Sequence, residues 1–297
     1  YTRPYTLSLH DALPICFKQE DIMSERLRLI DTIQLDTIDP NTGNQFEFKL
    51  LGGHFCGHCD GKIKGIFEAP KTEHIWENKA VNEKKFKELG KLISEIGEKQ
   101  ALCEWDEIYY AQAIIYMECA NLTRHYLTVQ TPGGRNWTSC RTEANKKIAL
   151  SIIAKAETII TADKPPVRLN ENRSFYKCNW CMMKEICFDQ KVPAVNCRTC
   201  AFSEPVINDK SGNGTWKCYK KNIDFTGSGA VCDSHLFLNT LVPYKTVDAD
   251  KSGQFPSWIK YSTPEGDIFY NVNSDAKTVF SMNCLTSEEI YKKEFFE

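Results

Sequence analysis

Two carboxylates and a lysine in the first third of the chain have the types and spacing of a metal-dependent hydrolytic centre. Asp60 is followed seventeen residues later by Glu77, and Lys79 stands two residues beyond it on the same strand-like run. Side chains alternate along a strand, so Glu77 and Lys79 share one face. Carboxylate oxygens suit Mg²⁺ or Mn²⁺, and a lysine can neutralise charge on a phosphate. A solvated hairpin face produces the same short pattern by chance.

Two further features indicate the same chemistry. Gln112 and Tyr116 are four residues apart in a helical segment, so both can point at one site. Lysines in this region favour a local phosphate-binding patch, although a solvated helix face would carry the same residues. These lysines are Lys79, Lys84, Lys85, Lys87 and Lys91.

Two groups of cysteines in the second half of the chain have metal-site spacing. Two residues between thiols let both sulfurs reach one ion from a tight turn. The second group offers the four thiolates of a structural Zn²⁺ site, with His235 as a rival ligand. The first group offers three, which leaves zinc, an incomplete cluster or unligated core cysteines open. The groups are Cys178, Cys181 and Cys187, then Cys197, Cys200, Cys218 and Cys232.

Composition restricts the classes of protein to consider. The 297 residues carry a net charge of -2, so nucleic-acid binding would need a local basic patch. No apolar run reaches membrane-spanning length, which predicts no membrane partner. The clustered spacing within the 14 cysteines favours metal ligation in a reducing cytoplasm over disulfides.

The first sixteen residues read YTRPYTLSLHDALPIC and show no clean period. This stretch resembles a translated sequencing-adapter segment. We therefore expect residues 1–16 to be non-native and the authentic start to be missing. An irregular N-terminal arm is the alternative.

Hydrophobic periodicity and turn signals predict an alternation of strands and helices. Helices are expected over residues 18–33, 82–96, 105–119 and 143–161. Strands are expected over 46–51, 54–59, 62–67 and 74–80 as an antiparallel meander, then over 122–130 and 137–141 as a hairpin. Short strands are expected after Pro243.

The segment His54–Phe86 reads HFCGHCDGKIKGIFEAPKTEHIWENKAVNEKKF, and it resembles the RecB-type branch of the PD-(D/E)XK nucleases, especially phage-encoded exonuclease-like members. The resemblance extends from about Phe17 into the region of Cys197 and more loosely through the tail. It implies that Asp60 binds metal, that Glu77 and Lys79 form the ExK pair, and that Gln112 and Tyr116 form the QxxxY motif.

The resemblance also identifies what this chain lacks. The family often has a metal-binding histidine on the helix before the meander, where this chain has Phe17; Glu20 remains as an acidic helper and candidate metal ligand. The group that begins with Cys178 resembles part of an iron–sulfur staple that holds a [4Fe–4S] cluster with one upstream cysteine. That fourth ligand is expected to be missing here, because Cys16 borders the adapter-like stretch.

The expected fold is α/β: a restriction-endonuclease-like core, with a central mixed sheet flanked by helices, a small cysteine-rich metal-binding module and a short β-rich tail. The expected boundaries are 1–16, 17–190 for the core, 191–241 for the zinc module and 242–297 for the tail. The expected function is that of a Mg²⁺-dependent deoxyribonuclease, an exonuclease of phage or bacterial DNA processing. Its expected partners are DNA and phage recombination proteins in the bacterial cytoplasm. The alternatives are a non-catalytic zinc-containing nucleic-acid-binding protein with a degenerate core and, less favoured, an iron–sulfur redox protein.

Overall fold

The computed structural model describes residues 7–227, 232–273 and 283–296, with side chains from Lys18 to Lys292 within these ranges. Contacts divide the chain into two compact units. Unit 1 takes the chain up to Leu50 and then Phe55–Ala156, and unit 2 takes Leu51–His54 and the chain from Glu157 onward. The division falls inside the segment 17–190 that was expected to form the core, and the domain boundaries stay a prediction.

A five-stranded mixed sheet forms the centre of unit 1, with the order β1-β4-β5-β6-β7. β5 and β6 run parallel, and the other neighbours are antiparallel. This confirms the expected mixed α/β architecture with a mixed central sheet. The strands are β1 (Gln34–Asp36), β4 (Gly61–Lys64), β5 (His74–Ala80), β6 (Arg124–Gln130) and β7 (Trp137–Glu143).

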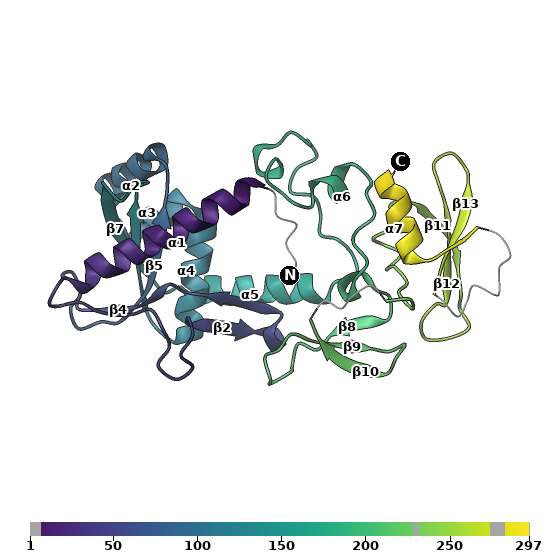
Figure 1. Ribbon diagram of the computed structural model, residues 1–297, viewed down its shortest axis with the longest axis horizontal. Coiled ribbons are helices and arrows are strands. Elements are labelled where there is room, and N and C mark those ends of the chain that lie inside the picture. The colour runs from purple at the N-terminus through teal and green to yellow at the C-terminus, as the bar shows by residue number, and fades with distance from the viewer. Residues whose placement is uncertain (1–6, 228–231, 274–282, 297) are drawn as a thin grey trace. The chain divides into compact units, whose positions relative to one another are not determined.

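Helices flank this sheet (Figure 1). α2, α3 and α4 form the crossover that a parallel β5–β6 pair requires. Asn82 caps α2 by accepting a hydrogen bond from the Lys85 N–H at 2.9 Å, and Asp106 caps α4 in the same way. The helices are α1 (Leu7–Arg28), α2 (Glu83–Ile96), α3 (Glu98–Trp105), α4 (Glu107–Ala120) and α5 (Lys146–Thr161).

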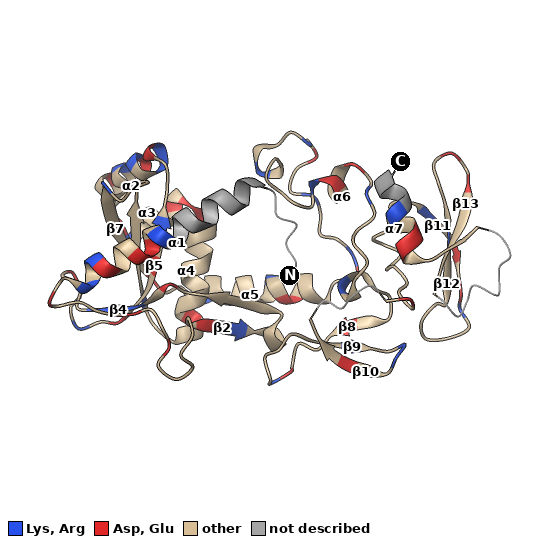
Figure 2. Ribbon diagram, in the orientation of Figure 1, with Lys and Arg blue, Asp and Glu red and all other residues tan. Residues whose placement is uncertain are grey.

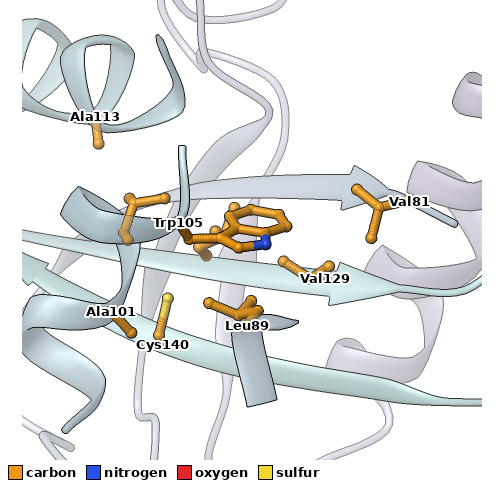
Figure 3. Packing of buried hydrophobic residues seen from close by; sticks show 9 residues of the cluster. Val81, Leu89, Ala101, Trp105, Ala113, Val129 and Cys140 are labelled. Carbon is orange, nitrogen blue, oxygen red and sulfur yellow. The ribbon is translucent and has the colours of Figure 1, made fainter. Parts of the chain in front are cut away.

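The two faces of the sheet bury different clusters, as strand alternation requires. Trp76 packs with Met23 and Leu27 of α1 on one face. On the other face, Val129 of β6 packs with Leu89 and Trp105 (Figure 3). β5 and β6 are therefore buried on both sides, which fixes their register and the directions of their side chains.

The structure corrects several expected elements. The predicted helix over 18–33 ends at Arg28, and the unpredicted β1 follows and pairs with β4. Gly65 permits this close approach, since a Cβ there would collide with the Thr32 carbonyl and its φ is +87°. α3 was not predicted, and the helix expected from Trp105 begins at Glu107, after the Asp106 cap.

The expected antiparallel meander over 46–80 was wrong as a continuous unit. β2 (Glu47–Leu50) and β3 (Phe55–His58) form a separate two-stranded ribbon. β4 pairs instead with β1 and β5. The chain leaves the ribbon at Cys59, whose N–H still donates to the Phe46 carbonyl at 3.2 Å, and enters the central sheet at Gly61.

Unit 2 contains two further sheets and two α-helices among its described residues. An antiparallel sheet has the order β10-β9-β8, and a second has the order β11-β12-β13-β14, which gives the expected short strands after Pro243. Leu236, Phe237 and Tyr261 are fully buried in its core. The elements are α6 (Lys184–Phe188), β8 (Ser203–Pro205), β9 (Thr215–Cys218), β10 (Ile223–Thr226), β11 (Lys245–Ala249), β12 (Trp258–Ser262), β13 (Ile268–Val272), β14 (Cys284–Leu285) and α7 (Ser287–Phe296).

None of the helices in the described part of the chain combines the length and the apolar character needed to cross a bilayer.

Candidate active site

The β4–β5 ladder brings Asp60 and Glu77 together. Gly61 pairs with Trp76, so Asp60 stands one step beyond the last pair, beside Glu77. The Asn78 N–H donates to Asp60 Oδ2 at 2.8 Å. A backbone donor on β5 therefore holds the Asp60 carboxylate at the edge of the strand that carries Glu77 and Lys79.

Glu77 is a buried carboxylate with an unsatisfied oxygen. Its side chain is 2% exposed, and Oε1 has no hydrogen-bond partner among the described residues. Lys79 Nζ donates to Oε2. Burial raises the pKa of Glu77 to about 8; the charge of Lys79 lowers it in part, and that of Asp60 raises it further. A buried acceptor without a partner lowers the stability of the fold, so Glu77 Oε1 is suited to binding a cation.

Lys79 links the carboxylates to α4. Burial opposes its charge, but the nearby carboxylates of Glu77 and Asp60 outweigh burial and raise its pKa, so the ammonium stays charged. Nζ also lies 5.4 Å from the centroid of the Tyr109 ring. The side chain is 18% exposed, which leaves it accessible from the open side of the site.

α1 adds a third carboxylate. The helix packs against β5, and Glu20 is half-buried there. Burial raises the pKa of Glu20 to about 7, the neighbouring charge of Asp60 raises it further, and Lys79 opposes both. The expected helper Glu20 therefore lies in the electrostatic field of Asp60 and Lys79.

Gln112 and Tyr116 lie on one face of α4, as their spacing predicts. Gln112 Nε2 donates to the Tyr116 hydroxyl at 3.1 Å. Tyr116 packs against Gly57 of β3 so closely that a Cβ there would stand 2.6 Å from the hydroxyl oxygen. Burial raises the pKa of Tyr116, the hydrogen bond from Gln112 opposes this shift, and the charge of Glu77 adds to it.

Glu20, Asp60 and Glu77 together are called the acidic group below. The sequence did not indicate the buried polar network that lies beside it. Trp76 Nε1 donates to Thr128 Oγ1 at 3.0 Å, and Thr128 Oγ1 lies 3.1 Å from Asn78 Oδ1. Gln130 Nε2 donates to the Gln19 carbonyl of α1 at 2.6 Å. The available signal was two polar residues, Thr128 and Gln130, next to the apolar Leu127 and Val129 in the buried part of β6.

Several lysines of the expected phosphate-binding patch are paired within the molecule. Lys79 is bound to Glu77, Lys85 to Asp106 at 2.7 Å, and Lys91 to Glu95 at 3.7 Å. Figure 2 shows basic and acidic residues interspersed along α2. Lys84 and Lys87 are exposed. Because carboxylates neutralise the other three lysines, the patch is less basic than the count of lysines suggests.

The second cysteine group gathers in one region of unit 2. Cys197 opens a short 3-10 helix (η3, Cys197–Thr199), and Cys218 ends β9. Burial raises the pKa of Cys197 to about 11, and charges on Cys200, Cys232 and Cys218 add to the shift. The four thiols therefore interact electrostatically. His235 is buried, with Nε2 within 3.1 Å of the Asn196 carbonyl.

The first cysteine group lies around a turn and α6. Cys178 is buried, Cys181 is exposed, and Cys187 is partly buried within α6. The Cys181 N–H donates to the Cys178 carbonyl at 3.2 Å, which makes a tight turn between the two thiols. The side chain of Cys16 lies outside the described residues.

The described ranges contain no ready-made metal cage: they hold no group of three or more His, Cys, Asp or Glu side chains arranged to hold an ion. The two cysteine groups and the acidic group are therefore gathered residues rather than formed coordination shells.

Comparisons with protein-family models, with curated proteins and with solved structures gave no significant match.

Proposed function

We propose that this protein is a metal-dependent deoxyribonuclease, an exonuclease of phage or bacterial DNA processing, with a restriction-endonuclease-like core. One observation carries the proposal. Asp60, Glu77 and Lys79 meet where β4 begins beside β5, the middle strand of the mixed sheet, and a buried oxygen of Glu77 has no partner among the described residues. Phage recombination proteins and the bacterial cytoplasm belong to the same proposal.

The donor set fits a hard divalent cation. Glu20, Asp60 and Glu77 bring oxygen ligands. Burial, with a smaller contribution from the charge of Asp60, raises the pKa values of Glu20 and Glu77, so a bound cation would compensate carboxylate charge that is poorly solvated. These residues would hold Mg²⁺ or Mn²⁺. The bound cation would supply charge stabilisation at the phosphate and acidify a water molecule.

The remaining residues position and neutralise charge. Lys79 stays protonated between Glu77 and Asp60, so its ammonium can neutralise charge on a phosphate oxygen. The Asn78 N–H holds Asp60, while Gln112 holds the Tyr116 hydroxyl beside the acidic group. Because Asn78 and Lys79 lie on β5, the register of the sheet positions both residues before any substrate binds.

We also propose that Cys197, Cys200, Cys218 and Cys232 hold a structural Zn²⁺, because four thiolates complete a closed site. Cys178, Cys181 and Cys187 would supply three thiolates to a [4Fe–4S] cluster. The ion pair between Lys79 and Glu77, which neutralises this carboxylate without a metal ion, favours one alternative function, a non-catalytic zinc-containing nucleic-acid-binding protein. That protein would retain DNA without cutting it.

The test is cleavage of end-labelled DNA with and without Mg²⁺ or Mn²⁺. We expect metal-dependent shortening by the unaltered chain and a loss of at least about a thousandfold in Asp60→Asn and Glu77→Gln. Glu73→Gln removes an exposed carboxylate just before β5 and is the matched control, with unchanged activity. Binding without cleavage under every metal condition would favour the alternative, and full activity in Glu77→Gln would reject the site.

A further inference from the structure

An apolar cavity of about 450 Å³ lies within unit 1. The β2–β3 ribbon, α4 and Ile152 of α5 supply its walls. It has the volume for a planar group the size of a nucleobase, and its lining is mostly hydrophobic and aromatic. Its principal side chains are Phe48, Phe55, Tyr109, Gln112, Ile115 and Tyr116.

The cavity has aromatic surfaces from two elements. The rings of Phe48 and Tyr116 lie with centroids 5.2 Å apart, at an angle of 40°. Tyr109 lines the same cavity, and its ring also faces Lys79 Nζ. Flat apolar ligands gain from stacking on such rings, and every nucleobase has a face that can stack in this way.

Gln112 gives the cavity a polar edge. One N–H of its amide is bound to the Tyr116 hydroxyl. Its other N–H and its carbonyl oxygen have no hydrogen-bond partner in the part of the chain that the structure describes. An amide offers a donor and an acceptor side by side, which is the pattern that nucleobase edges match.

One residue joins the cavity to the acidic group. Tyr109 lines the cavity, and its ring centroid lies 5.4 Å from Nζ of Lys79, the partner of Glu77. A phosphate at Lys79 therefore has its own nucleotide within reach of the cavity. A base that enters the cavity has to leave its stack, which is easiest at a single-stranded or frayed end.

We propose that this cavity binds the unstacked base of the nucleotide next to the scissile phosphate, so that the substrate is DNA with an unpaired end. The inference rests on the nuclease proposal and names its substrate class. Tyr109, Phe48 and Tyr116 provide the stacking faces, and Gln112 contacts the edge of the base.

The test uses the unaltered chain with Ca²⁺ in place of Mg²⁺ and a single-stranded oligonucleotide that carries terminal 2-aminopurine. We expect severalfold quenching of its fluorescence on binding, and about tenfold weaker binding of an oligonucleotide with a terminal abasic site. Ala111 lies half-buried in the cavity wall, so Ala111→Phe fills the space and should abolish the quenching. Ala111→Ser is the matched control and should retain it.

Equal binding of the abasic oligonucleotide, unchanged quenching in a folded Ala111→Phe, or no DNA binding at all would overturn the proposal. The abasic comparison uses the unaltered chain, so it decides the matter even where Ala111→Phe fails to fold. Mg²⁺-dependent cleavage without quenching would leave the nuclease proposal standing and reject the cavity. Quenching and the abasic difference without cleavage in Mg²⁺ would support the cavity and reject the nuclease.

Discussion

The acidic group of unit 1 and the cysteine quartet of unit 2 gather candidate ligands by different means. Asp60 and Glu77 are held by the β4–β5 ladder and by a backbone N–H that donates to Asp60 at 2.8 Å. Only Cys218 of the quartet lies in a strand, and the thiols are related by proximity rather than by hydrogen bonds to one another. A sheet can position ligands without an ion, whereas turns that carry thiols often need the metal to order them.

The largest effect is expected from a substitution in the cysteine quartet, which consists of Cys197, Cys200, Cys218 and Cys232. Cys218→Ser should lower the bound zinc from about one per chain to near zero and destabilise its surroundings by several kcal/mol, because metal binding and folding are coupled. Elemental analysis and thermal melting measure both quantities. Cys103→Ser alters an exposed thiol of α3 and should change neither. A zinc-free chain with an unchanged melting temperature would remove the quartet from the account.

A substitution of Lys79 tests whether this residue acts on the phosphate or on the bound metal ion. Lys79→Met should lower the cleavage rate by about a hundredfold, since it removes a charge that faces the phosphate. Affinity for Mn²⁺ should stay the same or rise, because the lysine repels a cation. Rates and metal titrations on the same preparation separate the two effects. A loss confined to metal affinity would assign Lys79 a different role.

The raised pKa of Glu77 predicts a pH-dependent stability in the absence of metal. The folded state holds the Glu77 proton up to about pH 8, while the unfolded carboxyl loses it near 4.5. This contribution is therefore complete below pH 4.5 and is lost as the pH rises through 8. Between pH 6.5 and 8 the loss should be about 2 kcal/mol.

Urea unfolding in EDTA at these pH values measures the loss, with Glu77→Gln as the comparison. The variant should show a flatter dependence because its amide does not titrate. The histidines His74 and His125 have lowered pKa values and titrate mostly below this window. Glu20, with its pKa raised to about 7, titrates within the window in both proteins, so the difference between the two curves isolates Glu77. Parallel curves for the variant and the unaltered chain would contradict the assignment of the effect to Glu77.

The smallest expected effect concerns the polar network behind the acidic group. Thr128→Val keeps the shape of the side chain but leaves Trp76 Nε1 without its acceptor, which should cost about 1–3 kcal/mol. The cleavage rate should change less than the free energy of unfolding, because the Thr128 side chain on β6 contacts the side chains of Trp76 and Asn78 rather than the carboxylates. Thr138→Val on β7 removes a partly exposed hydroxyl and should cost much less. Equal costs would show that the network does not support the site.

The parts of the fold that the sequence predicts are those with strong local signals. The strands β5 and β6 and the helix α2 were predicted close to their observed bounds from local patterns of residues. β1 has three residues and exists through its pairing with β4, a contact that no local pattern reveals. Likewise, no local pattern shows that β4 pairs with β1 and β5 rather than with β3.

The candidate site divides in the same way. Strand alternation is enough to place Glu77 with Lys79, and helical spacing is enough to place Gln112 with Tyr116. The Tyr109 ring beneath Lys79 depends on the packing of α4 against β5, so its part in the site could not be predicted. For the quartet, spacing indicated four thiols in one place but not their coordination.

Calorimetric titration of Mn²⁺ into the full chain asks whether the carboxylates that β4, β5 and α1 gather in unit 1 bind one divalent ion. At pH 7 we predict about one ion per chain and release of protons on binding, because Glu77 and Glu20 have raised pKa values. Glu77→Gln should weaken binding at least about tenfold, and Cys218→Ser should leave it unchanged. Unaltered binding by Glu77→Gln, or loss of binding in Cys218→Ser, would contradict the account.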